Sequence, residues 1–439
     1  MSYGSLSIEP PSRITMVAPV NPLVFWILGL LNNAAYVIML ASAKSISEGG
    51  TALVFIANII PAVTIKLSAP YWFDKVSYDT RLTMGSILMA SSFLTVAFFQ
   101  GSHSKYSLYF ELLGVSLASA QTGMGEASLL ALAGASDAPR PKPECLTCFA
   151  SGTGLAGIFG FFFKYMLNSV LGLSMRLTLV CATSLSVMYF SVYRKYLWGR
   201  KKARSLLTEH PTGDADACLH GYHQPATIVP LTDAPLPDEA FEDETQLSPV
   251  PKVHEMDASQ RFKLTLSLYP YIIPLFLVFA AEYTMQAGTW TAIGFPITDV
   301  KARNDFYFAA NWTYYAGVFV SRSSGTLFTA PMWLLWLMPI LQCINVAFFW
   351  IVAAHHVFYN WWLLIGCFYT GLLGGAVYVH GFTRICIDLP KEHTEFALSA
   401  TSVGECFGIL AADVCGLFLQ SCLYAINGLS GAAVVCPVY

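Results

Sequence analysis

The feature that most constrains this chain is a series of apolar runs, each long enough to cross a lipid bilayer as a helix. A bilayer core takes about 20 apolar residues per spanning helix. Short polar connections separate the runs, and one long polar interval follows the sixth run. The eleven predicted spans are 23–43, 51–69, 82–100, 106–132, 148–170, 174–193, 269–293, 307–324, 328–352, 357–383 and 395–423.

Composition supports the same conclusion. Of the 439 residues, 55% are hydrophobic and 12% are charged, whereas soluble globular domains carry roughly 25% charged residues. A chain with so little charge cannot cover a water-facing surface. The lipid bilayer is therefore its first expected partner. The net charge of −3 does not indicate a nucleic-acid partner. Most cysteines lie inside apolar runs as small hydrophobic residues, and no ligand cluster predicts a metal or another cofactor.

The position of the long polar interval predicts two halves. Six helices, a central cytosolic loop and a second set of helices are typical of an all-α, major-facilitator-like bundle, with the substrate between the halves. The excess of Lys and Arg in the even-numbered connections, of which the central loop is one, places the amino terminus in the cytosol. Eleven helices leave one missing from that plan, so eleven and twelve both stay open. The predicted parts are a cytosolic tail 1–22, a six-helix half 23–193, a disordered cytosolic loop 194–265, a second half 266–424 and a tail 425–439.

Polar and charged residues inside the predicted spans are the candidates for function. Such residues are costly in lipid and usually face a cavity or a partner. A cation suits an anionic group of a substrate, and a buried carboxylate can carry a coupling proton. The alternative is structural pairing with neighbouring helices. The substrate-path candidates are Asn32, Asn33, Tyr36, Lys66 and Arg322, and the coupling or gating candidates are Glu126, Glu282, Glu405 and Asp413.

Small residues in the fifth predicted span spell a glycine-rich motif. A dinucleotide-binding motif needs a strand before it, and here the motif opens a spanning run. Gly152, Ala156 and Gly160 recur every four residues on one helix face, which predicts close packing against another helix.

Two further motifs concern covalent modification. Asn311 begins a glycosylation sequon, although it lies at or inside the start of a predicted span. The last four residues, beginning at Cys436, have the outline of a prenylation box. An odd number of spans places them in the lumen, away from the prenylating enzymes, so glycosylation and lipidation both stay open.

Several stretches carry a family resemblance, and they occur in the family's order from about residue 23 to residue 423. In these stretches the chain resembles the battenin family of lysosomal and vacuolar membrane proteins. It departs from the family at Asn58, where the family has an acidic residue, and at Glu405, where the family has aspartate. The stretches are 25–33, 36–40, 60–70, 123–126, 151–154, 271–274, 281–283, 316–324, 371–375, 378–379 and 392–397.

The resemblance implies a lysosomal or vacuolar multi-pass membrane protein with eleven helices and a fold related to major facilitators. It also implies efflux of small polar solutes, glycerophosphodiesters or basic amino acids, and a role in lumenal pH homeostasis, with protons as partners. Lys66 and Arg322 could receive an anionic phosphodiester. The alternative is a non-transporting scaffold that regulates trafficking through proteins bound to the central loop. An enzyme is not expected, because the sequence contains no nucleophile-and-base pair or suitable carboxylate spacing.

Overall fold

The structure of the protein is a computed structural model, and the residues it describes are helical, with no strand among them. These residues are 21–46, 51–101, 106–137, 143–198, 253, 256–432 and 434–438. Most of the predicted amino-terminal tail and residues 199–252 of the predicted central loop lie outside this set. The all-α fold class predicted from the sequence is confirmed.

Among the described residues, the first half contains six long helices. Each predicted span of this half falls within one of them to within one residue, except that the fifth span also includes the turn after α5. Helices suit these runs because lipid offers no partner to an unpaired backbone group. α5 continues into a π-helical turn, η2, and the Ser77 hydroxyl caps the first turn of α3 by accepting from the Thr80 amide. The elements are α1 (Pro22–Ile46), α2 (Thr51–Trp72), α3 (Tyr78–Phe99), α4 (Ser107–Asp137), α5 (Glu144–Tyr165), η2 (Met166–Val170) and α6 (Met175–Tyr196).

The second half contains five long segments, and the last of them is broken. The predicted span 395–423 forms two helices that meet at Ser402. α10 begins earlier than predicted, because the Asp299 side chain accepts from the Lys301 amide and caps the helix there. The elements are α9 (Tyr269–Ala287), α10 (Val300–Arg322), α11 (Met332–His355), α12 (Leu363–Asp388), α13 (Lys391–Thr401) and α14 (Val403–Ile426).

A short helix, α8 (Ala258–Ser267), begins inside the interval 194–265 that the sequence predicts to be disordered. The Asp257 side chain accepts from the Gln260 amide, and the Gln260 side chain accepts from the Asp257 amide. This capping box satisfies backbone donors that a helix start otherwise leaves unpaired. The prediction of disorder is therefore wrong for the end of that interval.

Hydropathy and length identify eight helices in the described ranges as long and apolar enough to cross a membrane. A shorter apolar stretch, Ile56–Ala69, lies in α2. α4 and α10 are not among the eight, and both place charged or amide side chains in their interiors, such as Glu126 and Asn311. The total of eleven spans stays a prediction.

Close packing of α1 against α5 organises the first half. A β-carbon on Gly152 would lie 2.0 Å from the Trp26 carbonyl oxygen, and one on Gly160 would lie 2.6 Å from a Val37 methyl carbon. Ala156, between these glycines, is fully buried. Small side chains on this face of α5 therefore let the two helices approach closely.

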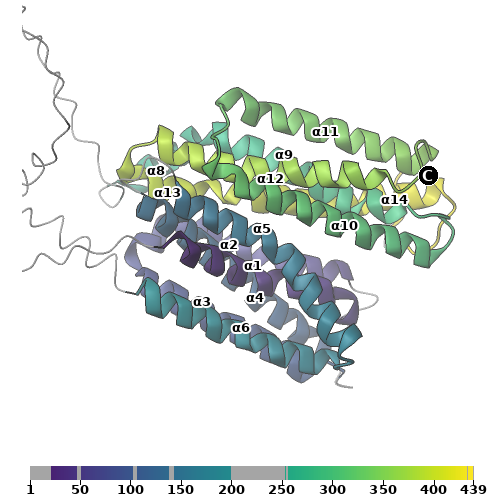
Figure 1. The fold of residues 1–439 in the computed structure, drawn as a ribbon, viewed down its shortest axis with the longest axis horizontal. Helices are drawn as coiled ribbons and strands as arrows, with labels where there is room; N and C mark the ends of the chain where they lie inside the picture. Colours follow the sequence, from purple (N-terminus) through teal and green to yellow (C-terminus); the bar gives the residue numbers. More distant parts are fainter. Residues whose placement is uncertain are drawn as a thin grey trace, which may run out of the picture. The chain divides into compact units, whose positions relative to one another are not determined.

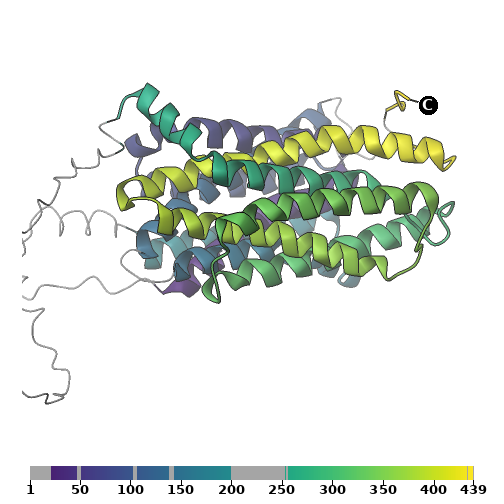
Figure 2. The ribbon, with the colours of Figure 1, turned by 90° about the horizontal axis from the view of Figure 1, so that it is seen from above.

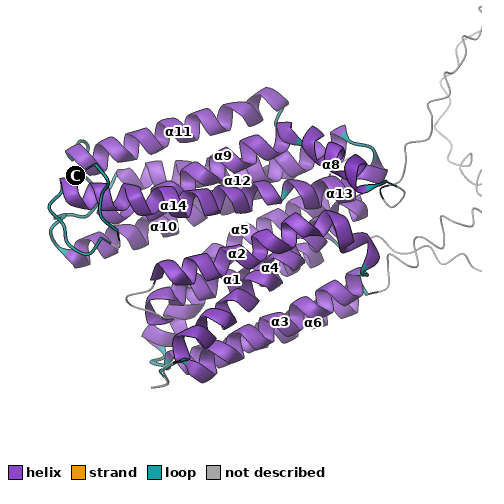
Figure 3. Ribbon diagram, turned by 180° about the vertical axis from the view of Figure 1, so that it is seen from behind, coloured by secondary structure: helices purple, strands orange, loops and turns teal. Residues whose placement is uncertain are grey.

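Several pairs of helices join the two halves, and three of these pairs make the most extensive contacts. α5 packs against α10, α2 packs against α14, and α4 packs against α13. Figure 1 shows α1 to α6 gathered beside α9 to α14, and Figure 2 shows the same bundle turned by 90°. Figure 3 shows from behind that helices make up both groups.

The bundle has two ends that the later description needs. The end with α8 and the start of α13 is called here the central-loop end, and the end where α14 finishes is called the carboxyl-terminal end (Figure 1). The end of α6 lies at the central-loop end, because the Tyr193 hydroxyl donates to Asp79 at the start of α3, and the neighbouring Tyr78 donates to Glu395 of α13. The end of α14 thus lies opposite the end of α6 and the start of α13.

Candidate substrate and gating site

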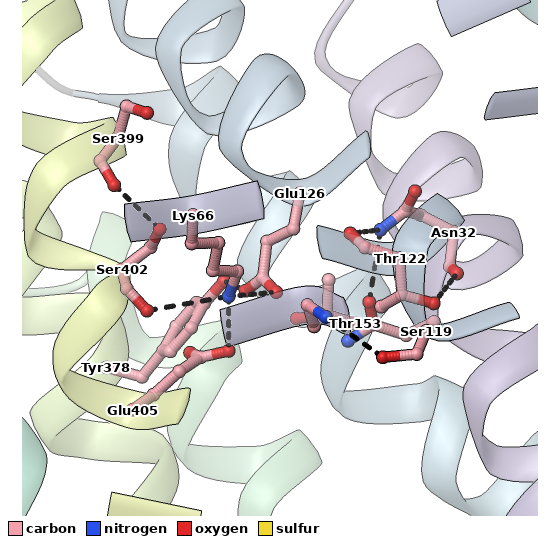
Figure 4. A network of polar contacts seen from close by, with 12 residues as sticks. Asn32, Lys66, Ser119, Thr122, Glu126, Thr153, Tyr378, Ser399, Ser402 and Glu405 are labelled. Atoms are coloured by element: carbon pink, nitrogen blue, oxygen red, sulfur yellow. Dashed lines mark hydrogen bonds and ion pairs between the residues drawn. The ribbon is translucent and has the colours of Figure 1, made fainter. Parts of the chain in front are cut away.

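A buried lysine in α2 lies at the centre of the candidate site. Lys66 is 1% exposed, and its Nζ donates to Glu126 Oε2 of α4 at 2.8 Å and to Glu405 Oε1 of α14 at 2.9 Å. It also lies 3.5 Å from the Ser402 carbonyl oxygen, at the break between α13 and α14. Figure 4 shows these three contacts converging on Nζ. A single cation therefore joins a helix of the first half to one of the second, in surroundings where an unpaired charge is costly.

A tyrosine of α12 extends this network. The Tyr378 hydroxyl donates to Glu126 Oε1 at 2.5 Å, so the two oxygens of Glu126 accept from different halves of the bundle. The guanidinium carbon of Arg322 lies 3.8 Å from the centre of the Tyr378 ring. Lys66, Glu126, Glu405, Arg322 and Tyr378 are called here the charge cluster.

Arg322 differs from Lys66 in the kind of partner that it has. Its Nη1 donates to the Thr153 hydroxyl of α5, and its Nε has no hydrogen-bond partner although the side chain is buried. Within the described part of the chain, the ion pairs of the cluster involve Lys66, and none joins Arg322 to a carboxylate. A hydrogen-bonding hydroxyl and an aromatic face hold this cation instead.

Glu282 of α9 is buried close to the charge cluster without a cation of its own. The side chain is 1% exposed, Oε1 accepts from the Tyr314 hydroxyl at 3.0 Å, and Oε2 has no hydrogen-bond partner. A β-carbon on Gly374 of α12 would lie 1.8 Å from Oε2, so glycine makes room for this carboxylate. Gly374 lies one helical turn from Tyr378. An ionised carboxylate buried without a cation is costly, and this environment therefore suits a carboxyl that carries a proton.

Asn32 and Asn33, two of the predicted substrate-path residues, differ in burial. Asn32 is fully buried, and its Oδ1 accepts from Gln121 at 2.9 Å and Tyr189 at 3.4 Å. Its Nδ2 lies 3.3 Å from the Thr122 carbonyl oxygen, so the side chain joins α1 to α4 and α6. Figure 4 shows Asn32 beside Thr122, apart from Lys66. Asn33 is half-buried and accepts from Asn32. Of the two alternatives for Asn32, the bonds favour helix packing.

Tyr36 and Asp413 are two further predicted residues, and among the described residues no hydrogen bond joins either of them to the charge cluster. Both are half-buried, and the Asp413 carboxylate lies within electrostatic range of the Tyr36 hydroxyl. Asp413 lies about two turns beyond Glu405 along α14, toward the carboxyl-terminal end. The structure therefore places Lys66, Glu126, Glu405 and Arg322 together, and leaves Asp413 outside their hydrogen-bonded network.

The two candidate modification sites are both occupied by structural contacts. Asn311 is 6% exposed, and its Nδ2 donates to the Tyr307 carbonyl oxygen at 2.8 Å inside α10. A buried amide cannot receive a glycan, so the geometry is against the glycosylation candidate. Cys436 forms a disulfide with Cys422 near the end of α14, which leaves no thiol for prenylation. The sequence did not predict this disulfide.

Further contacts between the halves lie toward the central-loop end. The Ser151 and Ser323 hydroxyls are 2.9 Å apart, between α5 and the turn after α10. At the end of the bundle, the Tyr78 hydroxyl donates to Glu395 of α13. Together with the charge cluster, these pairs join the halves at more than one helix interface.

Comparisons with known proteins agree with this architecture. The sequence profile of the CLN3 protein family matches residues 23–426. Protein btn1 of Aspergillus fumigatus is 31% identical over 418 residues, which are 90% of this chain and 86% of that protein. Battenin of the dog, Canis lupus familiaris, is 29% identical over 437 residues, 92% of this chain and 91% of that one.

Among solved structures, a double-tryptophan mutant of XylE matches with a TM-score of 0.54 at 10% identity, over 92% of this chain and 94% of that chain. At this identity the match shows the fold alone, and it confirms the major-facilitator-like bundle. The family profile covers both halves, including every residue of the charge cluster. The chain is therefore a multi-pass membrane protein that belongs to the CLN3 protein family.

Proposed function

We propose that the protein is a transporter of lysosomal or vacuolar membranes that exports small polar solutes from the lumen and influences lumenal pH. The observation that carries this proposal is the ion pair of Lys66 with Glu405, which joins the two halves inside the bundle. In alternating access, one half moves against the other around a central site. A contact between the halves at this depth must then break and form again in each cycle.

The energetics of buried ion pairs support a switching role for this contact. Well-packed apolar side chains often stabilise a protein as well as a buried ion pair or better. Lys66 and its two carboxylates are therefore a poor choice for stability alone. They suit an interface that must separate and allow charged groups to exchange partners.

The chemistry of the cluster favours an anionic solute over a cationic one. Arg322 has a buried donor, Nε, without a partner and no carboxylate counterion among the described residues. A guanidinium matches two oxygens of a phosphate or carboxylate group. Glycerophosphodiesters therefore come before basic amino acids as the proposed substrate class.

The test is flux in proteoliposomes. Wild-type protein should release labelled glycerophosphodiester, and Lys66→Met should abolish release because the contact between halves loses its cation. Lys164→Met is the matched control, since Lys164 donates to the Ala41 carbonyl within the first half, and it should retain most of the flux. Equal flux in Lys66→Met and wild type would contradict the proposal.

A folded wild-type protein that releases no glycerophosphodiester would remove this substrate class, and labelled arginine and lysine would then be tested in the same vesicles. Failure of both classes would favour the non-transporting scaffold. Deletion of residues 205–252, which lie outside the described residues, separates the two functions. A transporter should retain flux after this deletion, and a scaffold should lose its trafficking role.

A further inference from the structure

Tyr378 contacts two charged residues with two different parts of its side chain. Its hydroxyl donates to Glu126 of α4, in the first half, and its ring lies against Arg322, at the end of α10 in the second half. Tyr378 itself belongs to α12 and is fully buried. Figure 4 shows its side chain extending toward Lys66 and Glu405. No other side chain of the charge cluster contacts both Arg322 and Glu126.

The ring of Tyr378 lies against the guanidinium of Arg322 and is attracted by its positive charge. The guanidinium is planar and carries five N–H donors, and in this structure one nitrogen donates to Thr153 while Nε has no partner. Aromatic rings hold cations through the negative face of the ring. An anion with two acceptor oxygens would form stronger, charge-assisted hydrogen bonds with the same group. An anion would therefore weaken both neutral contacts of Arg322, because it neutralises the charge that attracts the ring and competes for the donor that reaches Thr153.

Both neutral contacts of Arg322 depend on the contact between the halves. Thr153 belongs to α5 of the first half, and the Tyr378 hydroxyl is bonded to Glu126 of the first half. Glu126 is in turn paired with Lys66, which also holds Glu405. Displacement of Tyr378 from Arg322 would therefore remove a hydrogen bond between the halves at the same time.

We propose that Tyr378 is a positioning residue that couples anion binding at Arg322 to separation of the two halves at Glu126. This inference rests on the proposed function. A phosphodiester or carboxylate that binds Arg322 displaces the Tyr378 ring, and the moving side chain withdraws its hydroxyl from Glu126. The halves then lose one contact of the charge cluster and separate more readily toward the central-loop end. When the anion leaves, the ring returns to Arg322 and the contact forms again.

Two variants separate the two contacts of Tyr378. Tyr378→Phe keeps a ring for Arg322 and removes the hydroxyl bond to Glu126, whereas Tyr378→Leu removes both. Tyr424→Phe is the matched control, because the Tyr424 hydroxyl donates to the Thr291 carbonyl oxygen at the other end of the second half. Thermal unfolding in detergent shows whether each variant is folded before it is used.

The separation of the halves can be followed by cross-linking. Ser151→Cys combined with Ser323→Cys places two thiols where the native hydroxyls are 2.9 Å apart across the halves. An oxidant then forms a disulfide that peptide mapping detects, and its rate reports how often this contact is closed. Binding of labelled glycerophosphoglycerol is measured on the same purified protein.

In the parent protein, which carries Ser151→Cys and Ser323→Cys and keeps Tyr378, glycerophosphoglycerol should slow cross-linking severalfold. With Tyr378→Phe, cross-linking should be slow without the ligand and the ligand should slow it little further. Affinity should rise, because displacement of the ring no longer breaks the bond to Glu126. With Tyr378→Leu, affinity should rise, because the competing ring is gone. Tyr424→Phe should behave as the parent in both measurements.

Full ligand-dependent slowing in Tyr378→Phe, or unchanged affinity in Tyr378→Leu, would overturn the inference while leaving transport intact. A parent protein that binds neither glycerophosphoglycerol nor another phosphodiester or carboxylate would overturn the inference together with the proposed substrate class.

Discussion

Lys66 Nζ in α2 and Glu405 Oε1 in α14 lie 2.9 Å apart, and this ion pair joins the two halves of the bundle. Glu126 pairs with the same Nζ at 2.8 Å, so the lysine is shared by two carboxylates. Sharing makes the pair sensitive to any change in either acid. Several predictions about stability and transport depend on this arrangement.

Loss of the shared cation should destabilise the fold more than loss of the whole pair. Lys66→Met leaves two buried carboxylates without a cation, and breaking a buried pair in this way costs about 3–5 kcal/mol. Lys66→Met combined with Glu405→Gln should recover part of that loss, because one of the two uncompensated charges is removed. Thermal unfolding of the two single variants and the double variant gives the coupling energy, and strictly additive effects would show that the residues do not interact.

Gly374 should tolerate no side chain, because its missing β-carbon makes room for the Glu282 carboxylate. Gly374→Ala would place a methyl carbon 1.8 Å from Oε2 and should greatly reduce transport and lower thermal stability. Gly381→Ala is the control on the same helix, since its β-carbon would meet nothing within 4 Å. Alanine there should stabilise α12 by up to about 1 kcal/mol, following helix propensity.

A shorter acid offers a rescue of that clash. Glu282→Asp in the Gly374→Ala background draws the carboxylate back from α12 and should restore part of the stability. If Gly374→Ala transported as well as wild type, the position of Glu282 against α12 would be wrong.

Asn32 should act in folding. Asn32→Ala leaves Gln121 without its acceptor in a buried site, and such unsatisfied groups cost about 1–3 kcal/mol. We expect lower thermal stability with an unchanged substrate affinity in the protein that folds. Asn33→Ala should have a smaller effect, because Asn33 is half-buried. A selective change of affinity in Asn32→Ala would instead place this residue in the substrate path.

The carboxyl terminus should lie on the lumenal side, where an oxidising compartment can form the Cys422–Cys436 disulfide during synthesis. The thiols should react with a bulky maleimide only after reduction, and only when the membrane has been permeabilised. In a variant that keeps only Cys422 and Cys436, a mass shift after reduction on gels of intact organelles would place the carboxyl terminus in the cytosol and contradict this orientation.

Hydropathy could predict the spanning helices because lipid imposes a length and an apolar composition on each one. It could not predict the break at Ser402, since both sides of that residue are apolar enough for one continuous span. Nor could it predict α8, whose capping box stabilises a helix within a polar, charged interval. The disulfide was missed because Cys422 reads as a small apolar residue of the last span, whereas Cys436 reads as the start of a prenylation box.

The charged members of the candidate site could be found from the sequence, because a charge inside a span is costly and rare. Their pairing could not, since Lys66 and Glu405 are far apart along the chain. Tyr378 and Gly374 carry no charge, and such residues are common in membrane helices. Their roles depend on the packing of α12 against Arg322 and Glu282, which only the fold brings together.

The most direct test of the transporter proposal is the response of flux to a pH gradient in proteoliposomes with an acidic interior. Wild-type protein should release glycerophosphodiester faster with the gradient than without it. Glu282→Gln should lose this acceleration because an amide cannot take up a proton. Glu111→Gln is the control: it changes a buried carboxylate in a different helix, α4, and should keep the acceleration. Equal acceleration in Glu282→Gln and wild type would contradict proton coupling through Glu282, and an absence of flux from the folded wild type would contradict transport of this solute.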